Sequence, residues 1–249
     1  MELAVVQVAS SLEPADNLAG LVDLPEADLV VLPEAYARDF GPPGSDVAPF
    51  AQGLEGPFVT ALVEAAGGRT LVAGMFERSE DSRRPFNTVV VVDSGGVVAA
   101  YRKIHLYDSF GYQESLALSA GATDQKVTFD VAGVRTGVLT CYDLRFPELA
   151  RTYAGEVDLL VVPAAWVAGP RKVRHWRTLL VARAIENVAF VAGAAQAGPR
   201  YSGNSLVVDP RGDLVVEAGI GPETVMAAID TALVAEARRE NPSLDNRRL

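Results

Sequence analysis

Short apolar runs alternate along the whole chain with turns and with stretches of helical periodicity. Most runs are apolar at nearly every position, which is typical of strands covered on both faces. The predicted strands are Leu3–Ala9, Asp28–Leu32, Thr70–Phe76, Thr88–Asp93, Val97–Lys103, Val134–Thr140, Val157–Val162, Val188–Ala194, Ser205–Asp209 and Thr224–Ile229. Polar segments at 94–96 and 210–213 predict hairpin turns between neighbouring strands.

Amphipathic stretches between the strands predict helices. They cover Pro57–Ala66, Pro147–Tyr153, Val173–Glu186 and Thr231–Arg239, the last of which follows a possible Thr cap. Strands and helices mixed throughout predict an α/β fold, and the hairpins predict mixed sheets. Because no linker or repeat divides the chain, we expect a single domain over residues 1–249, in which the polar residues 241–249 form a C-terminal arm that reaches a partner subunit.

The composition excludes several classes of protein. Of 249 residues, 49% are hydrophobic, which supplies a large core and excludes disorder, collagen and coiled coil. The 22 basic and 32 acidic residues give a net charge of −10, and an acidic surface repels nucleic acid. The N-terminus lacks a basic region before its apolar run, so it predicts a strand rather than a signal peptide. The longest apolar stretch, Leu159–Pro170, is shorter than the ~20 residues that span a bilayer, so we expect no membrane segment.

The single cysteine, Cys141, excludes a disulfide within the chain and a cysteine-based metal cluster, and it fits a cytoplasmic protein. It ends the run Val134–Thr140 and precedes a helix that begins near Phe146 and Pro147. A thiol at such a turn faces a cleft, where the helix N-terminus favours the thiolate and nearby N–H groups can bind an oxyanion. The alternative is a small buried apolar residue, the usual role of a lone cysteine.

Three further charged residues are candidates for chemistry. Glu34 follows the strand Asp28–Leu32, at a strand end of the kind where α/β proteins place active sites, and a carboxylate there can act as a base. Lys103 is one of only three lysines, and its ammonium suits a developing oxyanion. Glu114 could orient Lys103 or the substrate. Each could instead be an ordinary solvated surface charge.

Arg145 lies near the start of the predicted helix, where a cation opposes the helix dipole by roughly 0.3–1 kcal/mol. Two partners could offset this cost. One is Glu148, three residues further along, and the other is the carboxylate of a substrate bound beside Cys141.

Other chemistries find less support in the sequence. His105 and His175 could form a Cys–His pair with Cys141, but a structural or surface role fits both better. The chain lacks the sequence patterns of zinc proteases, of phosphate- and dinucleotide-binding loops and of the serine nucleophile elbow. We therefore expect no metal and no organic cofactor.

Three segments together resemble the nitrilase superfamily of carbon–nitrogen hydrolases. They are Leu32-Pro33-Glu34-Ala35, residues 101–106 (Tyr-Arg-Lys-Ile-His-Leu) and residues 139–148 (Leu-Thr-Cys-Tyr-Asp-Leu-Arg-Phe-Pro-Glu). The resemblance implies a four-layer α-β-β-α sandwich, a homodimer, and a catalytic triad of Glu34 as base, Lys103 as oxyanion stabiliser and Cys141 as nucleophile. It also implies a supporting role for Glu114. The backbone N–H of Tyr142 would complete the oxyanion site.

Within that family the chain looks most like the Nit branch, which contains ω-amidase and deaminated glutathione amidase. We therefore expect a thiol-dependent amidase that cleaves the side-chain amide of a small 2-oxo-acid amide, with Arg145 binding the substrate carboxylate. Asn204 and the short loop Ser109–Tyr112 depart from that branch. The rival hypotheses are a nitrilase or N-carbamoyl amino acid amidohydrolase, a Cys–His hydrolase, and a non-enzymatic binding module on the same scaffold.

Overall fold

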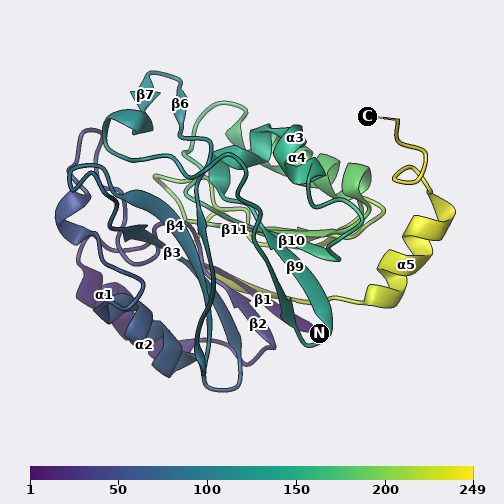
Figure 1. Ribbon diagram of the computed structural model, residues 1–249, viewed down its shortest axis with the longest axis horizontal. Coiled ribbons are helices and arrows are strands. Elements are labelled where there is room, and N and C mark those ends of the chain that lie inside the picture. Colours follow the sequence, from purple (N-terminus) through teal and green to yellow (C-terminus); the bar gives the residue numbers. More distant parts are fainter. Residues whose placement is uncertain (249) are drawn as a thin grey trace.

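Two six-stranded mixed sheets lie face to face in the computed structural model, which describes residues 1–248 (Figure 1). The first sheet has the order β14-β1-β2-β3-β4-β5. Its strands are β1 (Glu2–Gln7), β2 (Leu29–Val31), β3 (Thr70–Glu77), β4 (Phe86–Asp93), β5 (Gly96–Arg102) and β14 (Glu223–Ala228). Strands β1, β2 and β3 are parallel, and the other three pair antiparallel.

The second sheet repeats this plan with the order β13-β12-β11-β10-β9-β8. Its strands are β8 (Thr128–Val131), β9 (Val134–Val138), β10 (Leu159–Ala164), β11 (Phe190–Ala195), β12 (Leu206–Val208) and β13 (Leu214–Glu217). Here β9, β10 and β11 form the parallel centre. A separate two-stranded hairpin, β6 (Asp108–Ser109) and β7 (Tyr112–Gln113), stands at one end of the molecule (Figure 1).

Helices cover the outer face of each sheet (Figure 1). Helices α1 (Pro14–Ala19) and α2 (Pro57–Ala66) lie on the first sheet, and α3 (Pro147–Arg151) and α4 (Lys172–Asn187) on the second. One apolar cluster fills the space between the sheets, and two others fill the spaces between each sheet and its helices. The predicted four-layer α-β-β-α sandwich is confirmed, and these three apolar layers explain why most strands are apolar on both faces.

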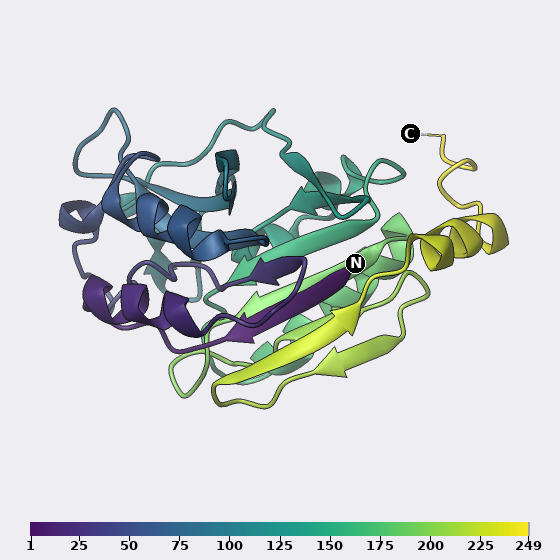
Figure 2. The same cartoon turned by 90° about the horizontal axis from the view of Figure 1, so that it is seen from below.

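The last helix, α5 (Thr231–Glu240), leaves the sandwich at the end opposite the β6–β7 hairpin (Figures 1 and 2). Its N-cap is Asp230, whose carboxylate accepts a hydrogen bond from the N–H of Ala232 at 2.8 Å, rather than the expected threonine. Residues 241–248 follow it, and Leu249, the last residue of the predicted arm, lies outside the described residues.

Five helices and strands have no counterpart among the predicted ones: α1, β6, β7, β8 and β13. They are between two and six residues long, so none of them offers a long enough pattern to detect. The remaining strands and helices agree with their predicted positions to within a few residues. Among the described residues, no helix is long and apolar enough to cross a membrane.

Candidate active site

The predicted site residues gather where strands of both sheets end. Glu34 follows β2, Lys103 follows β5 and Cys141 follows β9, so residues distant in sequence meet in one place. The close approach of β3 to the Glu34 turn requires glycine at position 74, because a Cβ there would lie 2.3 Å from the backbone nitrogen of Ala35. The meeting of strand ends therefore builds the site, as expected for an α/β protein.

Glu34, Lys103 and Glu114 form a buried group that we call the acid–lysine cluster. The Nζ of Lys103 donates a hydrogen bond to Glu34 Oε1 at 2.9 Å and to both carboxylate oxygens of Glu114 at 3.1 and 2.9 Å. All three side chains are at most 2% exposed. One ammonium thus binds two buried carboxylates, and Glu114 is positioned to orient Lys103.

Further donors fix the Glu34 carboxylate. Its Oε1 also accepts from Asn87 Nδ2 at 2.7 Å, and its Oε2 accepts from the backbone N–H of Ala165 at 2.6 Å. The side-chain amide of Gln196 donates to the Glu34 carbonyl at 2.9 Å. The carboxylate is therefore held in one orientation before any substrate binds.

Burial raises the pKa of Glu114, and the nearby Glu34 raises it further, against the opposing effect of Lys103. Burial alone would lower the pKa of Lys103, but Glu114 and Glu34 together raise it well above its usual value. Lys103 is therefore a permanent cation at neutral pH, as an oxyanion stabiliser requires.

Cys141 begins a 3₁₀ turn, η4 (Cys141–Arg145), and has a positive φ of 46°. A non-glycine residue in this region is strained, and such strain clusters at functional sites. The turn is closed by a capping box in which the side chains of Thr140 and Asp143 each bind the other's backbone N–H. Thr140 also donates its hydroxyl to the carbonyl of Pro163 at 2.8 Å, which ties the turn to β10.

The surroundings of Cys141 favour its neutral thiol. Burial raises its pKa well above the usual value, and the negative charge on Glu34 and a hydrogen bond to that carboxylate raise it further, although Lys103 lowers it. Burial and Glu34 thus oppose the preference for the thiolate that we expect from the helix N-terminus.

Neither histidine serves Cys141 in this arrangement. The Nδ1 of His105 lies 2.8 Å from Asp143 Oδ1, and the imidazole stacks on Phe146 with ring centroids 3.7 Å apart. Asp143 is fully buried and also accepts a hydrogen bond from the hydroxyl of Tyr101 at 2.7 Å. His175 lies on α4 and lines neither cavity beside Cys141.

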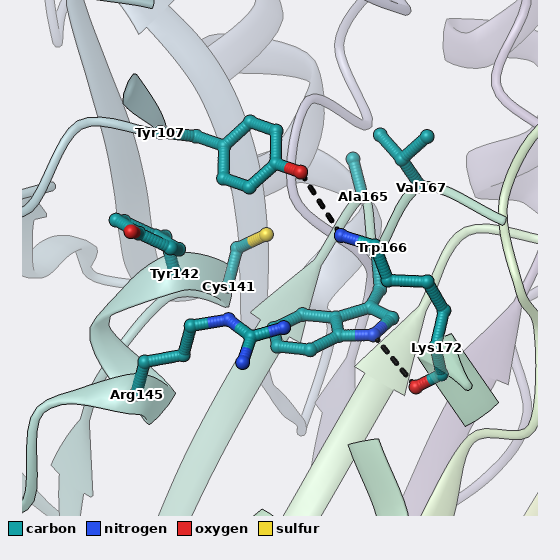
Figure 3. A pocket seen from close by; sticks show the side chains of 8 residues that line it. All are labelled: Tyr107, Cys141, Tyr142, Arg145, Ala165, Trp166, Val167 and Lys172. Carbon is teal, nitrogen blue, oxygen red and sulfur yellow. Dashed lines mark hydrogen bonds between the residues drawn. The ribbon is translucent and has the colours of Figure 1, made fainter. Parts of the chain in front are cut away.

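Arg145 and Lys172 form a second group, which we call the basic pocket. Figure 3 shows the Arg145 guanidinium across the indole of Trp166, 4.9 Å from the ring centroid, and Lys172 facing it from the other wall. The Nζ of Lys172 donates to the Tyr107 hydroxyl at 2.9 Å. Both basic residues and Tyr107 line a small cavity next to Cys141.

Neither cation of the basic pocket has a carboxylate partner within residues 1–248. The Nε and Nη2 of Arg145 are buried and donate no hydrogen bond there, and Glu148 is exposed and does not pair with Arg145. The sequence allowed two partners for Arg145, Glu148 and a substrate carboxylate, and Glu148 is thus excluded. Sequence reasoning missed Lys172, although its rarity as one of three lysines was a usable signal.

Comparison with known proteins identifies the family. The model of the carbon-nitrogen hydrolase family matches residues 2–239. The chain belongs to the carbon-nitrogen hydrolase family. It is therefore an enzyme of that type, and the resemblance found in the sequence is confirmed.

Individual members of the carbon-nitrogen hydrolase family show the same likeness. A deaminated glutathione amidase of Escherichia coli O157:H7 is 39% identical, over 90% of this chain and 86% of its own length. An omega-amidase of Mus musculus is 34% identical, over 99% of this chain and 94% of its own. The structure of a glutamate-to-glutamine variant of a Nesterenkonia amidase, with acrylamide added to its active-site cysteine, superposes with a TM-score of 0.80 at 27% identity, over 96% of this chain and 97% of that one.

Proposed function

We propose that this carbon–nitrogen hydrolase is a thiol-dependent amidase that cleaves the side-chain amide of a small 2-oxo-acid amide, releasing ammonia through a Cys141 thioester. The observation that carries the proposal is the pairing of two groups beside one thiol. On one side is the acid–lysine cluster, and on the other are two cations without an ion-pair partner among the described residues. The first supplies acid–base chemistry and the second fits a substrate carboxylate.

Glu34 would act as the general base in the first step. Because the thiol and this carboxylate line the same cavity, proton transfer can accompany attack of sulfur on the amide carbon. The tetrahedral oxyanion would be stabilised by the Lys103 ammonium and the backbone N–H of Tyr142. Protonated Glu34 then gives its proton to the leaving nitrogen, the C–N bond breaks, and a thioester remains.

Water completes the cycle. Glu34 would remove a proton from water as it attacks the thioester carbonyl, and the proton returns to the sulfur when the acid is released. Glu114 keeps Lys103 in place through two hydrogen bonds and compensates its charge while Glu34 is protonated. One carboxylate thus serves as base, acid and base again, with the same ammonium stabilising both oxyanions.

The substrate carboxylate would bind in the basic pocket. The Arg145 guanidinium offers Nε and Nη2 without acceptors, and Lys172 adds a second charge from the opposite wall. A guanidinium matches a carboxylate with two parallel hydrogen bonds, and the indole beneath it limits its movement. The named activities of the omega-amidase and deaminated glutathione amidase relatives agree with an amide substrate of this kind.

A panel of substrates tests the proposal through ammonia release. It contains 2-oxoglutaramate, 2-oxosuccinamate, a nitrile and an N-carbamoyl amino acid. We expect the first two to be hydrolysed and the last two to be poor. Carbon dioxide released with ammonia would instead indicate an N-carbamoyl amidohydrolase, and preferred hydrolysis of the nitrile a nitrilase.

The Cys141→Ala variant is the control for this panel. It should retain the fold, because the change removes one sulfur from a pocket wall, and should lose turnover entirely. Mass spectrometry of the wild-type protein quenched during turnover should find an acyl adduct on Cys141. Ammonia release at the wild-type rate from Cys141→Ala would refute the nucleophile, and a complete lack of hydrolysis by the wild type would support a binding module.

A further inference from the structure

Asn87 is a fully buried neighbour of the acid–lysine cluster. It belongs to β4 and lines neither cavity beside Cys141. Its side-chain nitrogen donates to Oε1 of Glu34 at 2.7 Å and to Oε1 of Glu114 at 3.3 Å. Its backbone carbonyl accepts a hydrogen bond from the N–H of Lys103 at 2.8 Å. One residue behind the site thus contacts all three members of the cluster.

The side-chain oxygen of Asn87 contributes no hydrogen bond. It is buried and has no partner among residues 1–248, which costs stability. The opposite orientation of the amide would be worse, because it would place this oxygen against two carboxylate oxygens. The side chain of Asn87 therefore acts on the cluster purely as a donor, through the two N–H groups of its amide.

The two oxygens of the Glu34 carboxylate differ in how many donors they meet. Oε1 accepts from Lys103 and from Asn87, whereas Oε2 accepts a single hydrogen bond within the described chain, from the backbone N–H of Ala165. Each carboxylate oxygen offers about two lone-pair positions. Both positions on Oε1 are therefore occupied, and the position that remains for a proton lies on Oε2.

The donor to Oε2 lies beside the nucleophile. Ala165 lines both cavities next to Cys141, and Glu34 itself lines the larger one. A proton that is taken from the thiol and passed to the leaving nitrogen must be held at a position open to the cavity. The free position on Oε2 meets this requirement, whereas Oε1 is occupied by donors from within the cluster.

Loss of the Asn87 amide would change where a proton can be held. The Oε1 atoms of Glu34 and Glu114 share the same two donors, this amide and the Lys103 ammonium. Without the amide, each Oε1 would have a free lone-pair position. Two neighbouring carboxylates then favour binding one proton between them. A proton held between the glutamates would keep Glu34 from accepting the proton of Cys141.

We propose that Asn87 is a positioning residue, which occupies the second lone-pair position on Oε1 of Glu34 and so directs the catalytic proton to Oε2. The inference rests on the proposed amidase function. The thiol proton moves to Oε2 as sulfur attacks the amide carbon, and it moves on to the nitrogen as the C–N bond breaks. Water then gives a proton to Oε2 as it attacks the thioester, and this proton goes to the sulfur as the C–S bond breaks.

Two substitutions change the donors at position 87. Asn87→Ala removes both side-chain N–H groups, whereas Asn87→Thr keeps one donor in a side chain of similar size that suits a strand. Asn187→Ala is the matched control. Asn187 is buried at the end of α4, donates one side-chain hydrogen bond, to the carbonyl of Arg183, and also has an unpaired side-chain oxygen among the described residues. Thermal unfolding of all three variants measures their loss of stability.

Two reactions separate the direction of the proton from general damage to the site. Hydrolysis of 2-oxoglutaramate requires a proton for the leaving nitrogen, whereas acylation of Cys141 by p-nitrophenyl acetate releases p-nitrophenolate, which requires none. In Asn87→Ala, kcat for the amide should fall by about 10²-fold with little change in KM, and the burst of p-nitrophenolate should slow by less than about tenfold. Asn87→Thr should recover part of the amide rate, and Asn187→Ala should match the wild type in both reactions.

Several outcomes would overturn the role of Asn87. Equal losses in the two reactions would indicate general damage to the site, and a raised KM with an unchanged kcat would indicate weaker binding. Wild-type rates in Asn87→Ala would also overturn it. If Asn87→Ala does not fold, Asn87→Thr takes its place, and the amide should again lose more than the ester. If the wild type reacts with the ester but hydrolyses no amide, the proposed function fails. The burst in Asn87→Ala then still decides, because a slower burst supports the role of Asn87 and an unchanged burst overturns it.

Discussion

The acid–lysine cluster and the basic pocket lie on two sides of one thiol and are built in opposite ways. In the cluster every charge has a partner, because Lys103 bridges Glu34 and Glu114 at 2.9–3.1 Å. In the basic pocket Arg145 and Lys172 repel each other, and no carboxylate among the described residues compensates them. The charges of the acid–lysine cluster are therefore compensated without substrate, whereas those of the basic pocket would be compensated by a substrate carboxylate.

Because of this difference, we expect the acid–lysine cluster to stabilise mainly the transition state and the basic pocket to stabilise the Michaelis complex as well. A preorganised cluster stabilises charge that develops in the transition state and affects kcat. Uncompensated cations gain their partner when substrate binds, so they affect the Michaelis complex as well. Substitutions in the two groups should therefore differ in kind, and the predictions below test that difference.

The largest effect is expected for Lys103→Met, a change of similar size that removes the cation. Two buried carboxylates would then face each other, and kcat should fall by at least about 10³-fold, the scale of losing a main oxyanion donor. Removing the cation should also raise the pKa of Glu114 further. Lys126→Met, at a half-exposed lysine paired with Glu156, is the matched control. A raised KM with an unchanged kcat would contradict the oxyanion role.

The two groups also differ in how far their residues could be predicted from the sequence. Glu34, Lys103 and Cys141 each lie at or just after the end of a predicted strand. Strand ends converge by the rules of α/β folds, so position and residue type together indicated these three residues. The strands and helices followed from apolar runs and helical periodicity, whereas the four layers followed from the resemblance to the nitrilase superfamily. Strand ends and apolar runs are local patterns that can be recognised in the sequence without knowing the tertiary structure.

Lys172 and Asn87 could not be assigned in that way. Lys172 begins a long helix, and its contacts with Tyr107 and Phe110 depend on how the segment before α4 crosses the second sheet. Asn87 lies inside β4, and only the register between β4 and the Glu34 turn gives its amide a carboxylate partner. Such contacts are set by tertiary distances that no local pattern encodes.

A smaller effect, and on binding, is expected for Arg145→Gln. Losing a partly buried guanidinium–carboxylate contact costs about 2–3 kcal/mol, so kcat/KM for 2-oxoglutaramate should fall by roughly 30- to 150-fold, mainly through KM. A neutral amide of similar length should lose less than about threefold. Arg135→Gln, at a half-exposed arginine of β9 that pairs with Asp130, is the control. Equal losses on charged and neutral amides would indicate that Arg145 only supports the fold of η4.

The smallest effect concerns the pH dependence of binding. Burial and the charge on Arg145 lower the pKa of Lys172, so Lys172 loses its proton at a lower pH than an ordinary lysine. Because the neutral amine cannot attract a carboxylate, KM for 2-oxoglutaramate should rise on the alkaline side by up to about tenfold, while KM for a neutral amide stays flat. Lys172→Arg should remove this rise, because arginine remains charged. Arg145→Gln should move the rise to higher pH, since it removes the like charge that lowers the pKa of Lys172. If KM rose at the same alkaline pH in the wild type and in Arg145→Gln, the charge on Arg145 would not affect the pKa of Lys172.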